Sequence, residues 1–270
     1  MTDEAANFER VAEAFDRQSP VFDDYEERNA GVIWMRSVIH EHMDKYVHEG
    51  ERLLDLNAGT GTDAIHFAHK GLSVHALDIS GGMLEKLRGK AARGCVSERI
   101  SIGHQSFADL SGFGDRQFNH VFSNFGGLNC TDNPSGVISQ FSRILVPGGT
   151  VTLVVMPPVC PWELAAIIKG NFRLAFRRLR KGGTRANVEG VMFKTYYHSP
   201  ARLLRSFGNA YSLAELRGLC AIVPPPNFDR MASRHPKLFR KLTVLDNRLC
   251  THIPFTSWAD HYILTMRYNP

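Results

Sequence analysis

Short apolar runs alternate with segments of helical periodicity over residues 51–156. The apolar runs are RLLDLN (52–57), SVHALDI (73–79), RISIGHQ (99–105), FNHVFSNF (118–125) and GGTVTLVVM (148–156). Helical periodicity is found between them at 62–70, 81–94 and 135–145. This alternation is typical of parallel strands joined by right-handed crossovers. It predicts an α/β fold whose cofactor-binding core is a doubly wound, mostly parallel, seven-stranded sheet.

The residues before this core have the spacing of helices. Apolar positions recur at helical intervals up to Ser19-Pro20, which is expected to end the first helix. A second helix is predicted at about 32–47. We therefore expect residues 1–50 to form an N-terminal helical cap.

The alternation stops after Met156. A helix is expected from Trp162 to about Arg180. Further elements are predicted at 194–198 (extended), 200–207 (helical) and 230–249 (helical). We interpret 157–256 as a helical insertion with other substrate-covering segments and the sixth-strand region, and 257–270 as a terminal strand that completes the sheet. Ligands of open α/β sheets bind at the carboxyl ends of the strands, so these insertions are expected to cover the substrate.

Composition places the chain among globular proteins. Its 270 residues carry a net charge of +5, and no stretch approaches the ~20 apolar residues that a membrane span needs. The opening MTDEAANFER lacks an apolar signal region, so we expect a soluble, cytoplasmic protein. The five cysteines occur singly and the histidines lack a ligand-like cluster, which predicts free thiols and no metal site.

The positive charge is concentrated in one segment. Lys169 to Arg205 contains ten basic residues and a single acid, Glu189. Within it, Lys169, Arg173 and Arg177 recur every four residues. Three interpretations are open: the solvated face of an amphipathic helix, a site for an anionic substrate or acidic carrier protein, and contact with an anionic membrane surface.

A glycine-rich turn follows the first predicted strand. In LLDLNAGTGTDAIHFA (53–68), Gly59-x-Gly61-x-x-Ala64 matches the fingerprint GxGxxG/A. Asp78 comes 19 residues after Gly59, where a carboxylate can accept hydrogen bonds from ribose hydroxyls. NAD(P) and other adenosine cofactors fit these residues equally well, so an NAD(P)-dependent oxidoreductase is one hypothesis.

Three features favour a different adenosine cofactor. Asp55 lies inside the first strand, where its charge would repel a pyrophosphate but suits a cofactor bearing ammonium and sulfonium groups. About 50 residues of helical character precede that strand. A Pro-Gly-Gly turn in ILVPGGTVTLVV (144–155) lies between a helix and the fifth strand.

With LLDLNAGTGTD, then ALDIS before GGMLEKLR, then LVPGG, the sequence resembles the class I S-adenosylmethionine-dependent methyltransferases, type-11-like bacterial small-molecule enzymes among them. The resemblance implies S-adenosylmethionine as cofactor and S-adenosylhomocysteine as product. The implied cofactor site consists of Asp55, the backbone of Asn57, Ala58, Gly59, Thr60 and Gly61, then Asp78 at the ribose, Ile79 beside adenine, Ser106 and Phe107 at the adenine amino edge, and Asn124 after the fourth strand.

Two residues depart from the family pattern. Asn57 replaces the family's first glycine, and Ser106 replaces an acid that often contacts adenine. Asparagine tolerates the left-handed conformation better than other non-glycine residues, so we expect the turn to survive. The departures motivate an alternative in which the chain is a non-catalytic binding module that keeps the fold.

The acceptor side is less specific. SNFGGLNC (123–130) lacks the patterns of nucleic-acid methyltransferases, so a nucleic-acid substrate is not expected. SNFGGLNC, CPWE (160–163) and AFRR (175–178) resemble bacterial enzymes of secondary metabolism, which favours methyl transfer to a hydroxyl oxygen of a small aromatic or polyketide/lipid-like metabolite, free or carrier-bound. The oligomeric state is left open.

Candidate catalytic bases are the histidines His198 and His261. Adjacent strand residues point to opposite faces, so Asp260 is not expected to pair directly with His261. The residues assigned to the substrate are Tyr25 and Trp34 from the N-terminal helices, and Phe125, Trp162, Arg177 and Tyr197.

Overall fold

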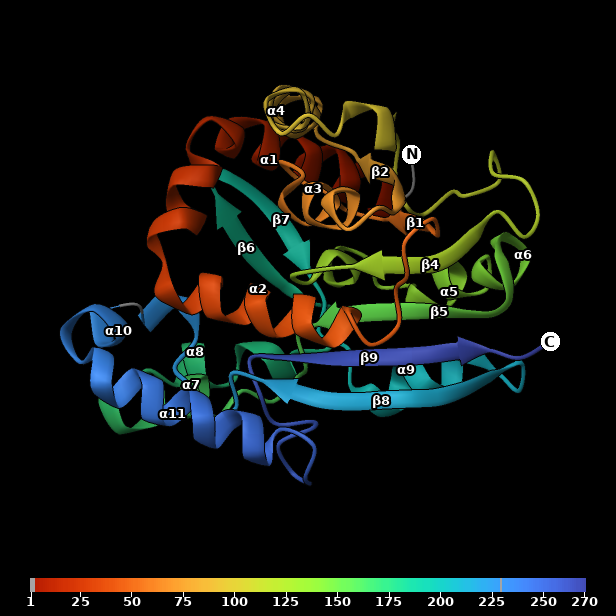
Figure 1. Ribbon diagram of the computed structural model, residues 1–270. Helices are drawn as coiled ribbons and strands as arrows, with labels where there is room; N and C mark the ends of the chain where they lie inside the picture. The colour runs from red at the N-terminus through yellow and green to blue at the C-terminus, as the bar shows by residue number, and fades with distance from the viewer. Residues whose placement is uncertain (1–2, 229) are drawn as a thin grey trace.

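The computed structural model describes residues 3–228 and 230–270. Its main sheet has seven strands in the order β3-β2-β1-β4-β5-β9-β8 (Figure 1). The strands are β1 (Arg52–Asp55), β2 (Ser73–Asp78), β3 (Ile100–His104), β4 (Phe118–Ser123), β5 (Leu145–Val155), β8 (Tyr211–Leu219) and β9 (His261–Tyr268). The first five are parallel, and β9 pairs antiparallel with both β5 and β8. The predicted doubly wound sheet is confirmed.

Helices cover both faces of this sheet. One face packs against α2 (Ala30–Met43), α3 (Thr62–His69) and α4 (Gly81–Arg93), and the other against α5 (Pro134–Ile138), α6 (Phe141–Ile144) and α9 (Pro200–Phe207). The alternation along β1 divides the core, because Leu53 belongs to the first cluster and Leu54 to the second. The helix predicted at 135–145 is thus two short helices.

The first helix does not end at Ser19-Pro20. Helix α1 runs without a break over Asp3–Arg28. Pro20 has no N–H for the carbonyl of Asp16, which would otherwise be its helical partner. The Ser19 hydroxyl donates to that carbonyl instead, at 2.9 Å, so the hydrogen bond lost to proline is replaced and the helix continues.

The segment after Met156 differs most from the prediction. The expected long helix is divided into α7 (Pro161–Leu164), α8 (Phe172–Ala175) and short 3-10 turns, with Gly170 in the left-handed region at φ 70°. Consequently the basic residues spaced by four do not form a stripe on one helix. A hairpin of β6 (Thr184–Val188) and β7 (Val191–Thr195) follows and packs against α1.

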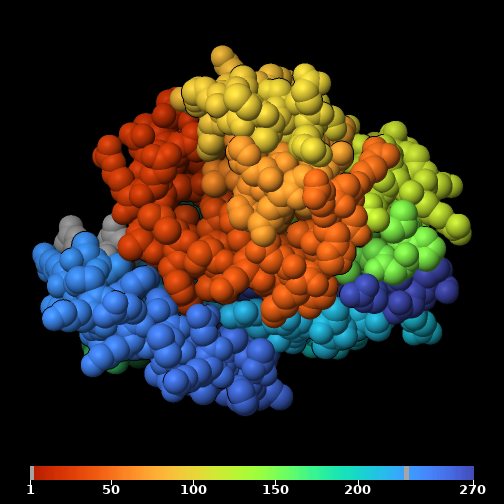
Figure 2. All heavy atoms as spheres, viewed as in Figure 1, coloured from red at the N-terminus to blue at the C-terminus, as the bar shows by residue number. Residues whose placement is uncertain are grey.

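The C-terminal helices form one side of the molecule. The helix predicted at 230–249 is divided at Pro236 into α10 (Arg230–Arg234) and α11 (Pro236–Leu249). Figure 2 shows these helices, in blue, meeting the orange N-terminal helices, and the Asn29 side chain donates to the Pro226 carbonyl at 3.0 Å at this boundary. No helix within the described residues is both long and apolar enough to cross a membrane.

Candidate active site

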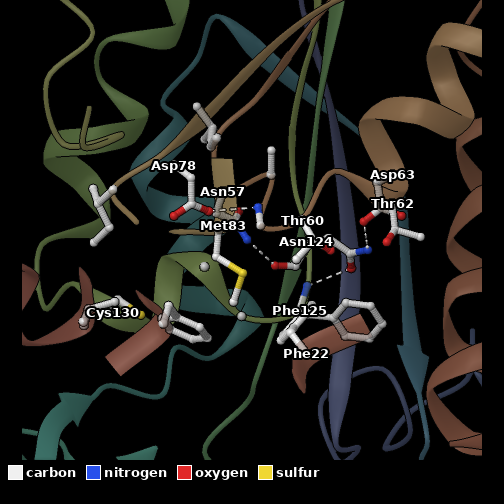
Figure 3. Close-up of a pocket in the computed structure, with 18 of the residues that line it drawn as sticks. Phe22, Asn57, Thr60, Thr62, Asp63, Asp78, Met83, Asn124, Phe125 and Cys130 are labelled. Atoms are coloured by element: carbon white, nitrogen blue, oxygen red, sulfur yellow. Dashed lines mark hydrogen bonds between the residues drawn. The ribbon is translucent and has the colours of Figure 1, made fainter. Parts of the chain in front are cut away.

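A cavity lies at the carboxyl ends of β1, β2 and β4, beneath α1. It encloses about 900 Å³ of space, part of it open to solvent. Figure 3 shows Asp78, Met83 and Cys130 towards one end and Phe22, Phe125 and Asp63 towards the other, with Asn57 and Thr60 between them. Strand ends, the turn after β1, the loop after β4 and α1 therefore share one site.

The turn between β1 and α3 requires its glycines. Gly59 and Gly61 adopt φ 54° and 83°, and a Cβ on Gly61 would lie 2.4 Å from Leu87. The Gly59 amide donates to Asp78 Oδ2 at 2.8 Å, and the Ser80 amide donates to Asp78 Oδ1 at 2.9 Å. Burial raises the pKa of Asp78. Both carboxylate oxygens keep acceptor capacity at the cavity wall, as binding of ribose hydroxyls requires.

Asn57 fits the turn for a reason that the sequence did not suggest. Its φ is not among the positive values, so the left-handed tolerance of asparagine is not used. Instead its side chain donates to the Asn124 carbonyl at 2.8 Å and accepts from the Ser123 hydroxyl at 2.6 Å. A Cβ on Gly127 would lie 2.3 Å from Asn57 Oδ1, so the glycine after β4 makes room for this asparagine.

Asp55 has a buried carboxylate oxygen without a hydrogen-bond partner. Its side chain is 1% exposed, Oδ1 accepts from the Asn57 amide at 3.4 Å, and Oδ2 has no hydrogen-bond partner. Burial, together with the nearby charge of Asp63, raises the pKa of Asp55 well above its usual range. Asp55 is not part of the cavity wall, so the ammonium group of a bound S-adenosylmethionine would compensate its charge across the wall rather than by a direct hydrogen bond.

A buried charge network at the other end of the cavity was missed by sequence reasoning. Asp63 accepts from Arg36, from His40 Nε2 at 2.6 Å and from Asn124 Nδ2 at 2.8 Å. Arg36 also pairs with Glu26 and lies 4.8 Å above the Phe125 ring. Burial opposes ionisation, but the positive groups hold the pKa of Asp63 far below its usual range. The only sequence signal was an acid in the first turn of a helix.

Most of the predicted cofactor residues are brought together. The cavity wall includes Asn57, Ala58, Gly59, Thr60, Asp78, Ile79, Phe107 and Asn124, together with Phe125, which was predicted to contact the substrate. Asp55 and Gly61 belong to the same turn but are not part of the wall. Ser106 is also outside it, and its hydroxyl accepts from the Ala108 amide at 3.1 Å.

The residues predicted to close the cavity from the N-terminal helices are displaced from it. Tyr25 is exposed and its hydroxyl accepts from Asn29 at 3.3 Å, while Trp34 packs edge-on against Phe239. The inward face of α1 instead carries Phe8, Val11, Phe15, Phe22 and Glu26. Because α1 continues past Pro20, its helical phase brings Phe22 and Glu26 inward and leaves Tyr25 outside.

His198 lies away from the cavity wall. It is fully buried, and its Nε2 lies 3.0 Å from the Thr131 carbonyl and 3.2 Å from the Leu128 carbonyl. Burial lowers its pKa to about 4. In this structure the neutral ring braces the loop after β4.

Arg177, one of the other residues assigned to the substrate, belongs to an ion-pair cluster with Glu163, Arg178 and Asp260. Arg177 donates twice to Glu163, both at 2.6 Å, and Arg178 joins Glu163 at 2.8 Å to Asp260 at 2.6 Å. The Tyr197 ring lies 5.2 Å from the Arg178 guanidinium. Neither Arg177, Tyr197 nor Trp162 is part of the cavity wall.

His261 does pair with Asp260, contrary to the expectation from strand alternation. His261 Nδ1 lies 2.9 Å from Asp260 Oδ2. Asp260 precedes β9 rather than lying in it, so its side chain is free of the strand's alternation. The His261 ring packs edge-on against Phe125 at 6.1 Å, behind the cavity wall. Cys160, Glu163 and Asp260 bring ligand-type atoms within 4.8 Å, but the two arginines already neutralise both carboxylates.

Comparison with known proteins shows which protein family the central part of the chain resembles. Residues 53–149 match the family described as methyltransferase domain. The chain is 33% identical over 157 residues to a demethylmenaquinone methyltransferase of Clavibacter sepedonicus, covering 57% of this chain and 59% of that one. It is 30% identical over 152 residues to a ubiquinone/menaquinone biosynthesis C-methyltransferase of Geotalea daltonii, covering 54% and 63%. The chain thus spans about three fifths of the length of these relatives.

Solved structures agree with this fold over nearly the whole chain. The [4+2]-cyclase SpnF superposes with a TM-score of 0.62 at 15% identity, covering 96% of this chain and 95% of that one. The CcbJ methyltransferase of Streptomyces caelestis gives 0.61 at 19% identity, covering 95% and 98%. Residues 53–149 are therefore similar to a methyltransferase domain, and the chain shares the fold of these solved structures.

Proposed function

We propose that this protein transfers a methyl group from S-adenosylmethionine to a small, uncharged molecule with a hydroxylated ring. The observation that carries the proposal is a single cavity with two chemically different ends. One end combines the glycine turn and Asp78 with apolar side chains. The other places two phenylalanines beside a buried carboxylate, Glu26.

The first end suits the nucleoside of the cofactor. Asp78 would accept from the ribose hydroxyls, Ile79 and Phe107 would flank adenine, and the charge of Asp55, behind the cavity wall, would favour the ammonium group. Phe8 packs edge-on against Phe107 at 5.5 Å, so α1 closes this end against water. When bound, the cofactor supplies a methyl group on a cationic sulfur.

The second end suits a flat, neutral ring. Phe22 and Phe125 both line it, and the nearest guanidinium, Arg36, is already neutralised by Glu26 and Asp63. An anionic acceptor would find no unpaired cation on the described cavity wall. The cavity therefore supports an aromatic or lipid-like acceptor rather than an anionic one.

Glu26 is the proton acceptor that we propose in place of His198 and His261. It lies one helical turn after Phe22 on the same face of α1, and burial raises its pKa despite the pairing with Arg36. Its carboxylate would take the hydroxyl proton of the acceptor while the ring is held against the methyl group. The oxygen so activated is the proposed methyl acceptor.

Transfer to a ring carbon is a second candidate. The observation that favours it is the similarity to the C-methyltransferase of Geotalea daltonii. The same deprotonated ring would be nucleophilic at the carbon next to its oxygen, so Glu26 would have the same role. Similarity of fold to a cyclase shows that the fold alone does not decide the reaction.

The decisive experiment follows a labelled methyl group from S-adenosylmethionine into a host extract and into hydroxylated naphthalenes and quinols. We expect labelled product, with carbon-13 spectra separating O-methyl from C-methyl. A thermal-shift panel with S-adenosylhomocysteine, NAD and NADP accompanies it. Cofactor binding without transfer to any acceptor would support the binding-module hypothesis, and stabilisation by a nicotinamide cofactor alone would support an oxidoreductase.

Replacement of the proposed base tests the mechanism. Glu26→Gln should lower kcat by about 100-fold with little change in KM, because it removes proton transfer but keeps the shape of the cavity. Wild-type kcat should rise with pH through the raised pKa of Glu26, and the variant should lose that limb. Exposed Glu27→Gln, its neighbour on α1, is the matched control. An unchanged kcat in Glu26→Gln would remove Glu26 from the mechanism.

A further inference from the structure

Residues 165–181, here called the insertion face, expose an unusual amount of apolar surface. Ile168 is 89% exposed and Phe172 59%. Large apolar side chains are also exposed at Ile167, Phe176 and Leu179. Five such residues within one short segment form a patch of the kind that marks an interaction site, whereas a single exposed apolar residue is ordinary.

Exposed cations alternate with these apolar side chains along the segment. The exposed cations of the segment are Lys169, Arg173, Arg180 and Lys181. The sequence from 165 to 181 contains no acid. The nearest acid before it, Glu163, is buried and paired with Arg177 and Arg178. The face is therefore both apolar and cationic.

The exposure is built into the fold, since the base of the segment is firmly held. Arg178 is 5% exposed and donates to Glu163, to the Asp260 side chain and to the Asp260 carbonyl at 2.9 Å. Val159 forms a bridge with Trp258, which is itself half exposed. The ion-pair cluster thus fixes 157–178 against the segment before β9 and leaves the apolar side chains outward.

The same cluster connects this face to the cavity. Asp260 contacts both Arg178 and His261, and the His261 ring rests against Phe125 of the cavity wall. The insertion face and the cavity are thus joined by a chain of packed side chains.

We propose that the insertion face docks on the surface of an anionic lipid bilayer. Apolar side chains enter the boundary between headgroups and acyl chains, while the lysines and arginines of the segment pair with anionic headgroups. An acidic carrier protein would explain the cations but not an isoleucine and a phenylalanine so fully exposed. The docking does not depend on methyl transfer, so its failure and the failure of the proposed function are separable.

Vesicle flotation of the full chain tests the proposal. Phosphatidylcholine vesicles with and without phosphatidylglycerol are compared at low and high salt. We expect binding to the phosphatidylglycerol vesicles that weakens with salt, and little binding to phosphatidylcholine alone. Ile168→Asp/Phe172→Asp should reduce binding about tenfold or more, and Lys169→Glu/Arg173→Glu should abolish its salt dependence.

Matched controls change similar residues elsewhere. Leu213→Asp places a charge at a half-exposed leucine of β8, and Arg88→Glu reverses an exposed cation of α4. Both controls should bind vesicles as the wild type does, and all variants should keep the wild-type unfolding temperature. Failure of the wild type to float with phosphatidylglycerol vesicles would overturn the proposal. So would equal losses in the control variants, or capture of an acidic carrier protein without vesicle binding.

Discussion

The turn after β1, which lines the cavity, and the segment after β5, which does not, are built in different ways. The turn is local: Asp78 binds the amides of Gly59 and Ser80, and each glycine has a conformational reason. The segment after β5 is held by ion pairs between residues far apart in sequence, such as Arg178 with Asp260. Short sequence motifs predict the first region. The second depends on contacts between residues that are far apart in sequence and meet only in the folded chain.

The largest expected effect comes from breaking the long-range cluster. Arg178→Met leaves the carboxylates of Glu163 and Asp260 buried beside each other with reduced compensation, which should cost about 3–5 kcal/mol of unfolding free energy. Urea denaturation measures it. Arg173→Met, an exposed neighbour, should change stability by less than about 0.5 kcal/mol. Equal stability of Arg178→Met and the wild type would show that the cluster does not hold the segment.

The next effect tests local compensation around the turn. Gly127→Ala places a Cβ against the Asn57 side chain and should destabilise the protein by about 1–3 kcal/mol. Asn57→Gly in the same chain should restore most of that loss, because it removes the clashing atoms. Thermal unfolding of the single and double variants measures the coupling. If the losses of stability in the two single variants add up in the double variant, the side chains at positions 57 and 127 do not compete for the same space.

Cofactor binding is the third measure. Asp78→Ala should weaken S-adenosylhomocysteine affinity by about tenfold or more in calorimetry, because it removes the proposed ribose acceptor and the partner of the Gly59 amide. Asp109→Ala removes an exposed acid and should leave the affinity unchanged. Wild-type affinity in Asp78→Ala would remove the carboxylate from the ribose site.

The smallest expected effect is that of Asp55→Asn, which should stabilise the free protein but weaken cofactor binding. Because the folded pKa of Asp55 is raised, the folded state binds more protons, so this residue lowers stability as pH rises from about 4 towards that pKa. Asp55→Asn should therefore stabilise the free protein at neutral pH by about 1 kcal/mol, with no gain near pH 4. The same variant should weaken S-adenosylmethionine binding. A lower stability of Asp55→Asn than of the wild type at pH 7 would contradict a destabilising effect of the Asp55 charge.

How far the sequence alone could lead follows the same division. The alternation of Leu53 and Leu54 and the order of the motifs predicted the sheet and most of the cofactor wall, since these signals depend on neighbouring residues. Because the Ser19 hydroxyl compensates for Pro20, helix α1 continues past residue 20. Phe22 and Glu26 therefore face the cavity, where Tyr25 was expected. The sequence pattern did not indicate that the Ser19 hydroxyl would replace the hydrogen bond lost at Pro20.

The acceptor end was less accessible to prediction. Asp63 gains its role from Arg36 and His40, which come from another helix and are not adjacent in any motif. Asp260 and His261 appeared incompatible because strand alternation was applied one residue too early. Such pairings are decided by where a strand begins, which sequence patterns place only to within a few residues.

Helix α1 has little core of its own. Its inward apolar residues form a small cluster with Ile79, Cys130 and the β6–β7 hairpin, around space that the cavity leaves open. A molecule seated there would complete the layer on which the helix rests. Ligand binding and the local stability of α1 (Asp3–Arg28) are therefore thermodynamically linked, and each can be measured through the other.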